Sequence, residues 1–196
     1  MTREFDLVVY GASGYTGRLV AEYLAQRYGA DRTLKWAMAG RTEAKLREVR
    51  AEIDAFEETP LIVADASNPE SLKSMARRAR CVVTTVGPYQ LYGEPLIAAC
   101  VEKGTDYVDL CGEPAWMRAM IDKYEASAKK SGARIVFSCG FDSIPFDLGV
   151  WFTQEEAMKE FGAPARDIKC RVRAMKGKFS GGTAASLKAT MAAAFK

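Results

Sequence analysis

The 196-residue sequence contains no histidine. Histidine is the usual general base, triad member and metal ligand near neutral pH, so its absence excludes the enzyme classes that depend on it. Any acid–base chemistry must fall to Asp, Glu, Lys, Tyr, Cys or water. We therefore expect neither a Ser-His-Asp hydrolase nor a protein-bound metal centre.

The cysteines do not suggest a disulfide framework or a zinc site. Their number is odd, and no two of them have the C-x-x-C spacing. They are Cys81, Cys100, Cys111, Cys139 and Cys170. Scattered, unpaired thiols are typical of a reducing compartment, so we expect a cytoplasmic protein.

Long apolar runs and a strong charge imbalance are also missing. No uncharged apolar run approaches the ~18 residues that a membrane helix needs, so we expect no integral membrane segment. The N-terminus leads directly into a strand-like run, which argues against a signal peptide. The net charge is +3, with 27% charged and 48% hydrophobic residues, which is typical of a globular domain and does not favour nucleic-acid binding.

One glycine-rich stretch, Gly11-Ala-Ser-Gly-Tyr-Thr-Gly17, stands out against these absences. An apolar, strand-like run (5–10) precedes it, and a run with helical apolar spacing (18–24) follows it. This context predicts a dinucleotide site, with G-x-x-G-x-x-G spacing as a variant of G-x-G-x-x-G. The glycines permit a tight turn and close packing, and the helix start offers N–H groups to phosphates. The predicted phosphate-binding residues are Gly11, Ser13, Gly14, Tyr15, Thr16 and Gly17.

Arg41 follows the second predicted strand (34–39) after a single glycine. In NAD-binding folds this position usually carries an acidic residue for the ribose 2′-hydroxyl. A guanidinium can instead hold a 2′-phosphate through two parallel hydrogen bonds. We therefore favour NADP(H) as the cofactor, the alternative being that Arg41 is a solvated residue at the start of the helix predicted over 43–56.

Two later loops complete the predicted cofactor site. Asp65 and Ala66 follow a strand over 61–64, and the Asp65 carboxylate could meet the adenine amino group or shape its own loop. Gly87 and Pro88 follow a strand over 81–86, at the switch point where ligands of such sheets bind. We predict that their backbone forms the wall beside the nicotinamide ribose, with Tyr89 next to the reacting carbon or packed on the loop.

The alternation of strands and helices predicts a Rossmann-type, doubly wound parallel sheet over residues 1–164, because the strands are apolar on both faces. Further strands are expected over 106–110 and 133–138. Their ends place Asp109, Glu113 and Asp142 at the ligand edge of the sheet. Glu113 precedes a proline, and at such a position helix capping is a commoner role than catalysis.

The pattern changes after residue 164. Strict alternation over 168–175 predicts a strand buried on one face, as in an antiparallel sheet. Residues 165–196, with a helix from Thr183, would begin a second, mixed α/β domain that is either cut short or completed by a partner. Lys169, Arg171 and Arg173 share the exposed face, which is either solvated or a docking surface for an acidic acyl carrier.

Several nucleotide enzymes are excluded by their missing residues. The G-x-x-x-x-G-K-[S/T] motif is absent, so the chain is not a P-loop ATPase. No tyrosine is followed four residues later by lysine, so the Tyr/Lys pair of short-chain dehydrogenases is missing. Acylphosphate reductases have a similar glycine loop, but they use a cysteine activated by histidine.

A longer resemblance remains, carried by motifs that occur in order along the chain. They are Gly11-Ala-Ser-Gly-Tyr-Thr-Gly17, Ala39-Gly-Arg41, Val86-Gly-Pro-Tyr89 with Tyr92-Gly-Glu-Pro95, Asp109-Leu-Cys-Gly-Glu-Pro114 and Cys139-Gly-Phe-Asp-Ser-Ile-Pro145. Together they resemble the saccharopine-dehydrogenase-like oxidoreductases, in particular the trans-acting enoyl reductase branch. The resemblance implies an NADP-binding Rossmann domain followed by a mixed α/β substrate domain, most of which this shorter chain lacks.

The resemblance also implies a reaction in lipid metabolism. Hydride would pass from NADPH to the β-carbon of an unsaturated acyl or polyketide-type substrate, free or carrier-bound. From their positions we predict Tyr89 as a donor and Asp142 as an orienting group, since the resemblance supplies no catalytic pair. The alternatives are an imine- or amino-acid-oxidising enzyme of the saccharopine dehydrogenase type, or a non-catalytic NADP-binding module. The chain could also form a homo-oligomer.

Overall fold

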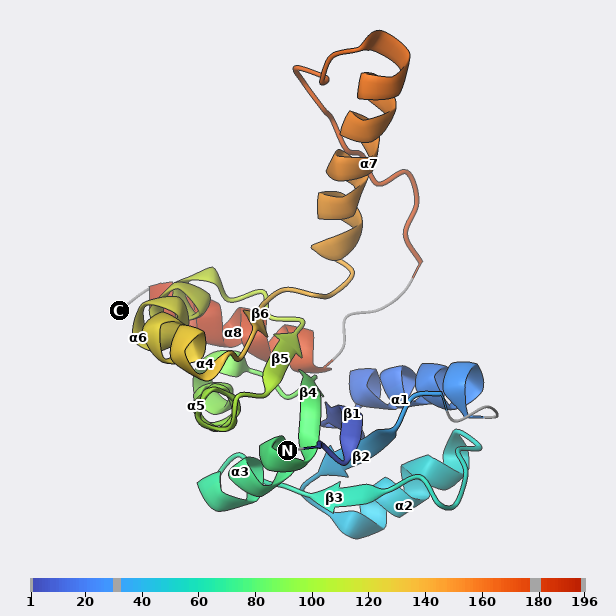
Figure 1. Cartoon of the computed structure of the whole chain (residues 1–196), viewed down its shortest axis with the longest axis vertical. Coiled ribbons are helices and arrows are strands. Elements are labelled where there is room, and N and C mark those ends of the chain that lie inside the picture. The colour runs from blue at the N-terminus through green and yellow to red at the C-terminus, as the bar shows by residue number, and fades with distance from the viewer. Residues whose placement is uncertain (1, 30–32, 177–180, 195–196) are drawn as a thin grey trace.

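A computed structural model of the chain describes residues 2–29, 33–176 and 181–194 (Figure 1). Its parallel strands form one sheet in the order β3-β2-β1-β4-β5-β6. The strands are β1 (Phe5–Tyr10), β2 (Trp36–Gly40), β3 (Leu61–Val63), β4 (Ala79–Thr84), β5 (Asp106–Asp109) and β6 (Ile135–Val136). The strand order reverses between β1 and β4, as in a dinucleotide-binding fold. The predicted Rossmann-type sheet is thus confirmed.

Helices cover the two faces of the sheet unequally. They are α1 (Tyr15–Tyr28), α2 (Glu43–Glu52), α3 (Pro69–Arg78), α4 (Tyr89–Tyr92), α5 (Glu94–Lys103), α6 (Pro114–Ser131), α7 (Ile144–Phe161) and α8 (Gly181–Ala194). Apolar residues of α1 and α2 form one buried cluster with β1 and β2. A larger cluster joins α3, α5 and α6 to the opposite face (Figure 1).

A row of side chains across five strands shows how far the helix layer formed by α1 and α2 extends over the sheet. Met38, Val9, Val83, Val108 and Val136 are register partners from β2 to β6. Met38 and Val9, beneath α1 and α2, are fully buried, whereas Val136 at the sheet edge is 47% exposed. The α1–α2 layer therefore covers only the β1–β3 half of this face.

The helix ends follow from local chemistry. Asn68 caps α3, its side-chain oxygen accepting the Ser71 N–H at 3.3 Å, and Pro69 occupies the first turn. At the amino ends of the strands, the Arg3 guanidinium donates to the Arg77 carbonyl at 2.6 Å and to the Lys103 carbonyl. One arginine thus satisfies carbonyls at the ends of both α3 and α5.

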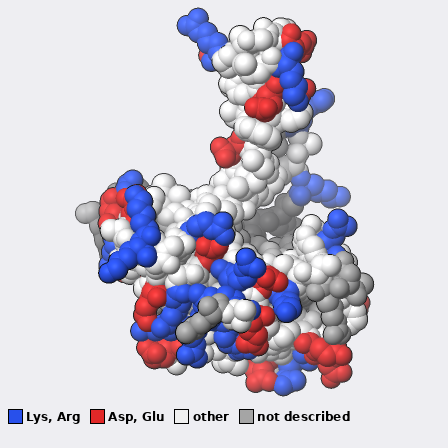
Figure 2. Space-filling view, viewed as in Figure 1, with Lys and Arg blue, Asp and Glu red and all other residues white. Residues whose placement is uncertain are grey.

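Helix α7 leaves the body of the molecule as a projecting arm (Figure 1). Its side chains Leu148, Trp151, Phe152 and Phe161 are 53%, 62%, 60% and 73% exposed. Figure 2 shows few charges on the stem of this arm, whereas Lys, Arg, Asp and Glu are mixed over the body in the same view. No helix within the described ranges is both long and apolar enough to cross a membrane.

The segment after α7 differs in part from the prediction. The strand expected over 168–175 does not form, and residues 167–176 have no regular structure. A strand must exchange backbone hydrogen bonds with a neighbour, and none of the described strands pairs with this segment. The helix expected from Thr183 is present as α8. The domain boundary at residue 164 remains a prediction.

Candidate functional site

A cavity of about 560 Å³ lies at the carboxyl ends of β1, β2 and β4. It is lined by Tyr10, Gly11, Ser13, Gly14, Gly40, Arg41, Asp65, Ala66, Ser67, Thr85, Val86, Gly87, Leu91 and Tyr92. The strand order reverses at this place, between β1 and β4. In open α/β sheets ligands bind at this switch point, so the cavity is the candidate cofactor site.

The first and last glycines of the loop are required by space. Gly11 has φ +91°, and a Cβ there would lie 2.8 Å from both the Thr85 hydroxyl and a Val86 methyl carbon. A Cβ on Gly17 would lie 2.1 Å from the Gly11 carbonyl oxygen. Strand, loop and helix therefore approach more closely than any side chain would permit, which is the contact that the third glycine of the motif provides.

The start of α1 is open toward the cavity. Gly14 is its N-cap, with extended backbone and no side-chain hydrogen bond to the first turn. The first N–H groups of a helix have no partner within the helix. Together with the helix dipole they form an anion site, so the loop fits the pyrophosphate of a dinucleotide.

Arg41 lines the same cavity, one residue beyond β2. Its side chain is exposed, and within the described residues no hydrogen bond or ion pair engages the guanidinium. Its charge helps to lower the pKa of Asp65 and opposes the rise in the pKa of Tyr10. An arginine without a fixed partner at this position fits a 2′-phosphate, which would supply the missing acceptor.

Asp65 and Tyr10 line the cavity beside Arg41. The Asp65 carboxylate accepts the N–H and the hydroxyl of Ser67, each at 2.8 Å, and these bonds hold the pKa of Asp65 below its usual value. Burial raises the pKa of Tyr10 to about 12, and the Asp65 charge acts in the same direction. Asp65 therefore shapes its loop, while its contact with adenine remains a prediction.

The loop after β4 forms the far wall. Gly87 lines the cavity, and Pro88, joined to it by a cis peptide bond, is buried at the start of α4. Tyr89 is only 4% exposed. Its hydroxyl donates to the Thr84 carbonyl at 3.2 Å and accepts the Leu110 N–H at 3.4 Å. Both hydrogen-bonding directions of this hydroxyl are used inside the protein, and burial raises its pKa.

Asp142 lies apart from the cavity, in the exposed turn before α7. Its carboxylate lies 3.4 and 4.0 Å from the positions that a Cβ on Gly140 or Gly112 would occupy. It is not among the residues that line the cavity. The catalytic roles of Tyr89 and Asp142 remain predictions.

Two buried carboxylates support the carboxyl edge of the sheet. Asp109 accepts the Tyr107 hydroxyl at 2.7 Å and the N–H groups of Cys111 and Ser138 at 3.0 and 2.8 Å. Burial raises the pKa of Asp109 despite these bonds. Glu113, expected to cap a helix, accepts the N–H groups of Tyr89 and Gln90 at the start of α4. It makes no such bond to α6, the helix that it precedes.

Most of the predicted cofactor residues lie together in this cavity. They are Gly11, Ser13, Gly14, Arg41, Asp65, Ala66 and Gly87. Tyr15, Thr16 and Gly17 form the first turn of α1 instead. Thr85 and Val86 were not singled out from the sequence, although they continue the strand that pairs with β1 beside Gly11. Leu91 and Tyr92 belong to α4, which is too short to show a helical period.

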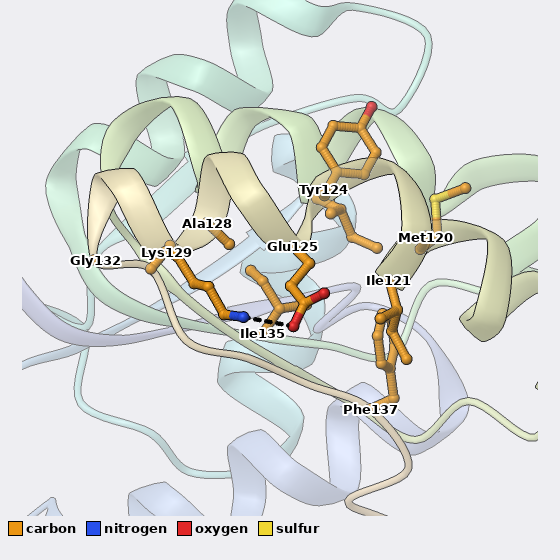
Figure 3. A pocket seen from close by; sticks show the side chains of 11 residues that line it. Met120, Ile121, Tyr124, Glu125, Ala128, Lys129, Gly132, Ile135 and Phe137 are labelled. Carbon is orange, nitrogen blue, oxygen red and sulfur yellow. Dashed lines mark hydrogen bonds and ion pairs between the residues drawn. The ribbon is translucent and has the colours of Figure 1, made fainter.

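A second cavity, of about 410 Å³, lies between α6 and the sheet edge (Figure 3). Its lining is mostly apolar, with Ile121, Ile135 and Phe137 around it and the Lys129–Glu125 ion pair at 2.7 Å. It shares no lining residue with the first cavity, so it is not part of the candidate cofactor site.

Comparisons with known proteins identify the family of the chain. The family model of the saccharopine dehydrogenase NADP binding domain matches residues 7–136. A putative trans-acting enoyl reductase of Mycobacterium tuberculosis is 51% identical over 186 residues, 94% of this chain and 44% of the relative. A trans-acting enoyl reductase of Mycobacterium leprae is 44% identical over 191 residues, 96% of this chain and 45% of the relative. The chain thus spans less than half the length of these relatives.

Solved structures share the fold at low identity. Apo saccharopine dehydrogenase (L-Glu forming) from Saccharomyces cerevisiae has a TM-score of 0.61 and 17% identity, covering 79% of this chain and 32% of that one. Triphenylmethane reductase from Citrobacter sp., complexed with NADP(H), has a TM-score of 0.52 and 17% identity, covering 78% of this chain and 56% of that one. These likenesses show the Rossmann fold.

Proposed function

Because the chain belongs to the saccharopine dehydrogenase NADP-binding domain family, we propose that it binds NADP(H) and acts in the reduction of an unsaturated acyl substrate. The substrate part of the proposal draws on relatives whose names describe trans-acting enoyl reductases. This function would place the protein in lipid metabolism. The free cysteines among the described residues agree with a cytoplasmic location.

One observation carries the cofactor proposal: Arg41 and the glycine loop line the same cavity. The loop offers N–H groups at a helix start, where no side chain competes for them. The guanidinium, which lines the same cavity, has no fixed acceptor among the described residues. This pair of anion sites matches the pyrophosphate and the 2′-phosphate of NADP(H).

The residues of the chain would mainly orient the cofactor. When bound, NADPH supplies a hydride for the β-carbon of an enoyl thioester, and a proton is added at the α-carbon. The Gly87–Pro88 backbone would lie against the nicotinamide ribose. Tyr89 could serve as a donor only by exchanging its bond to the Thr84 carbonyl for one to the substrate. Asp142 would orient groups at the same edge of the sheet.

Carrier docking is a separate part of the proposal. Lys169, Arg171 and Arg173 are exposed, as are Arg166 and Lys176 on the same segment. Acyl carrier proteins of acidic charge would be attracted to such a segment, chiefly through faster association. We propose that residues 166–176 receive a carrier-bound substrate.

Two measurements test the function. Calorimetric titration with NADPH and NADH should show binding, with preference for NADPH. The protein is then mixed with NADPH and enoyl thioesters, or with imines as the competing substrate class, and NADPH oxidation is followed at 340 nm. Oxidation with enoyl thioesters supports the proposal. Oxidation with imines alone, or binding without oxidation by any acceptor, would contradict the enoyl reductase assignment and favour the corresponding alternative.

A further inference from the structure

We propose that Glu113 is a positioning residue that couples the C-terminal helix α8 to the nicotinamide side of the cofactor cavity. The inference rests on the proposed NADP(H) site and adds a connection between that site and a segment distant in sequence. The connection consists of three hydrogen bonds to a single carboxylate. They come from two elements, α4 and α8.

The carboxylate of Glu113 is nearly inaccessible, with the residue 4% exposed. One oxygen accepts the Tyr89 N–H at 3.0 Å and the Ser186 hydroxyl at 2.8 Å. The other accepts the Gln90 N–H at 2.8 Å. No Lys or Arg of the described residues forms an ion pair with it, so neutral donors alone hold this buried acceptor. Each lost donor therefore leaves the carboxylate less well solvated and its side chain less firmly fixed in position.

Two of the donors belong to α4, the short helix that supplies part of the cavity wall. Tyr89 and Gln90 begin α4, a helix of only four residues. The same short element supplies Leu91 and Tyr92 to the cavity lining, and Gly87 precedes it. A helix of one turn has little stability of its own. The Glu113 carboxylate thus determines where this wall lies.

The third donor comes from α8. Ser186 lies near the start of that helix, 3.7 Å from the position that a Cβ on Gly87 would occupy. Figure 1 shows the start of α8 at the carboxyl end of the sheet, beyond β4. When α8 is docked, the Ser186 hydroxyl completes the set of hydrogen-bond donors around the Glu113 carboxylate. When α8 is displaced, the carboxylate has one donor fewer, and the cavity wall formed by α4 is held less firmly.

This coupling makes a specific prediction about the two halves of the cofactor. The adenosine half would meet the glycine loop, Arg41 and Asp65, none of which forms a hydrogen bond or ion pair with the Glu113 carboxylate. The nicotinamide half would meet the wall that Glu113 holds. Loss of the Ser186 bond should therefore weaken binding of whole NADP⁺ and leave binding of 2′,5′-ADP, which lacks the nicotinamide half, unchanged.

The experiment compares Ser186→Ala, Ser186→Thr and Glu113→Gln with the unmodified chain. We expect Ser186→Ala to weaken NADP⁺ binding about fivefold, the size of one net hydrogen bond. Ser186→Thr keeps a hydroxyl and should restore the affinity. Glu113→Gln places an amide donor against backbone donors and should weaken NADP⁺ binding at least as much. In all three variants 2′,5′-ADP should bind as it does to the unmodified chain.

Matched controls are Ser127→Ala on α6 and Glu155→Gln on α7, both at exposed positions. Equal weakening of NADP⁺ and 2′,5′-ADP would indicate general destabilisation and overturn the proposal, as would unchanged NADP⁺ binding in Ser186→Ala.

A second readout works without cofactor. Amide hydrogen exchange at Tyr89 and Gln90 should accelerate about tenfold in Ser186→Ala relative to Ser127→Ala, because their acceptor is held less firmly. Unchanged exchange overturns the coupling. If the unmodified chain binds neither NADP⁺ nor 2′,5′-ADP while exchange accelerates, the proposed function fails and the coupling stands.

Discussion

The position of a Cβ on Gly17 lies 2.1 Å from the carbonyl oxygen of Gly11. This close contact between Gly17 and the backbone of Gly11 joins β1 to α1 and leaves the start of α1 facing the cavity. It also explains why the loop tolerates G-x-x-G-x-x-G spacing, since the two outer glycines carry the steric requirement. Gly14 is less confined, its Cβ position lying 3.2 Å from the same oxygen.

Gly17→Ala should therefore separate α1 from β1 and abolish NADPH binding, because a methyl group cannot fit against a backbone oxygen. We expect a loss of at least about 2 kcal/mol in the free energy of unfolding, typical of overpacking. Urea unfolding and calorimetric titration measure the two effects. Gly149→Ala, in open space on α7, is the control and should be neutral or slightly stabilising. Normal binding by Gly17→Ala would contradict the proposed phosphate site.

Arg41→Ala should weaken NADPH binding by about tenfold or more, about 1.4 kcal/mol, while NADH binding barely changes. The guanidinium would contact only the 2′-phosphate, which NADH lacks. Arg47→Ala, on the exposed side of α2, serves as the control. The 2′-phosphate assignment would be refuted by an equal loss for both cofactors.

Tyr89→Phe removes the hydroxyl between the Thr84 carbonyl and the Leu110 N–H. We expect the free energy of unfolding to fall by about 1 kcal/mol, because the Thr84 carbonyl and the Leu110 N–H each lose a partner. Thermal and urea unfolding measure this loss. The predicted donor role requires in addition a fall in NADPH oxidation of about a hundredfold at saturating substrate. A stable variant with full activity would remove both roles.

Asp109→Asn tests the pH dependence of stability. The pKa of Asp109 is raised in the folded protein, chiefly by burial, so the folded state retains a proton that the unfolded state loses. Its contribution to stability is complete below the usual pKa and is lost as pH rises through the raised pKa. From about pH 4 upward, the stability of the unmodified chain should therefore fall relative to that of Asp109→Asn. Urea unfolding over that range measures the difference, and parallel profiles would disprove the assignment.

Carrier docking predicts that the combined changes Lys169→Glu, Arg171→Glu and Arg173→Glu weaken binding of an acidic acyl carrier protein about tenfold at low salt. Raised ionic strength should reduce the difference, because exposed charges are screened. Fluorescence anisotropy with a labelled carrier measures it. The control changes Arg27, Lys45 and Lys130 to Glu, which alters net charge equally at other exposed positions. Equal weakening by both triple variants would show that net charge alone is responsible.

Much of the fold could be predicted because its signals are local. The apolar run Phe5–Tyr10 and the Asn68 cap of α3 each specify backbone conformation within a few residues, and so does Gly132, whose left-handed backbone ends α6. The prediction of a strand over 168–175 was wrong because a strand depends on a non-local partner. Alternation shows that a segment could be buried on one face, but a strand also needs a neighbouring strand, which the pattern does not contain.

The sequence by itself determined the glycine loop, the place of Arg41 at the end of β2 and the family of the chain. These features depend on residue spacing and backbone preference within short stretches of sequence. Only the tertiary structure decided that Glu113 caps a helix 24 residues earlier and that α8 completes its shell. It also decided that the Tyr89 hydroxyl is enclosed between Thr84 and Leu110. Which donor reaches a buried acceptor depends on how the helices pack together, and a local sequence pattern does not specify that packing.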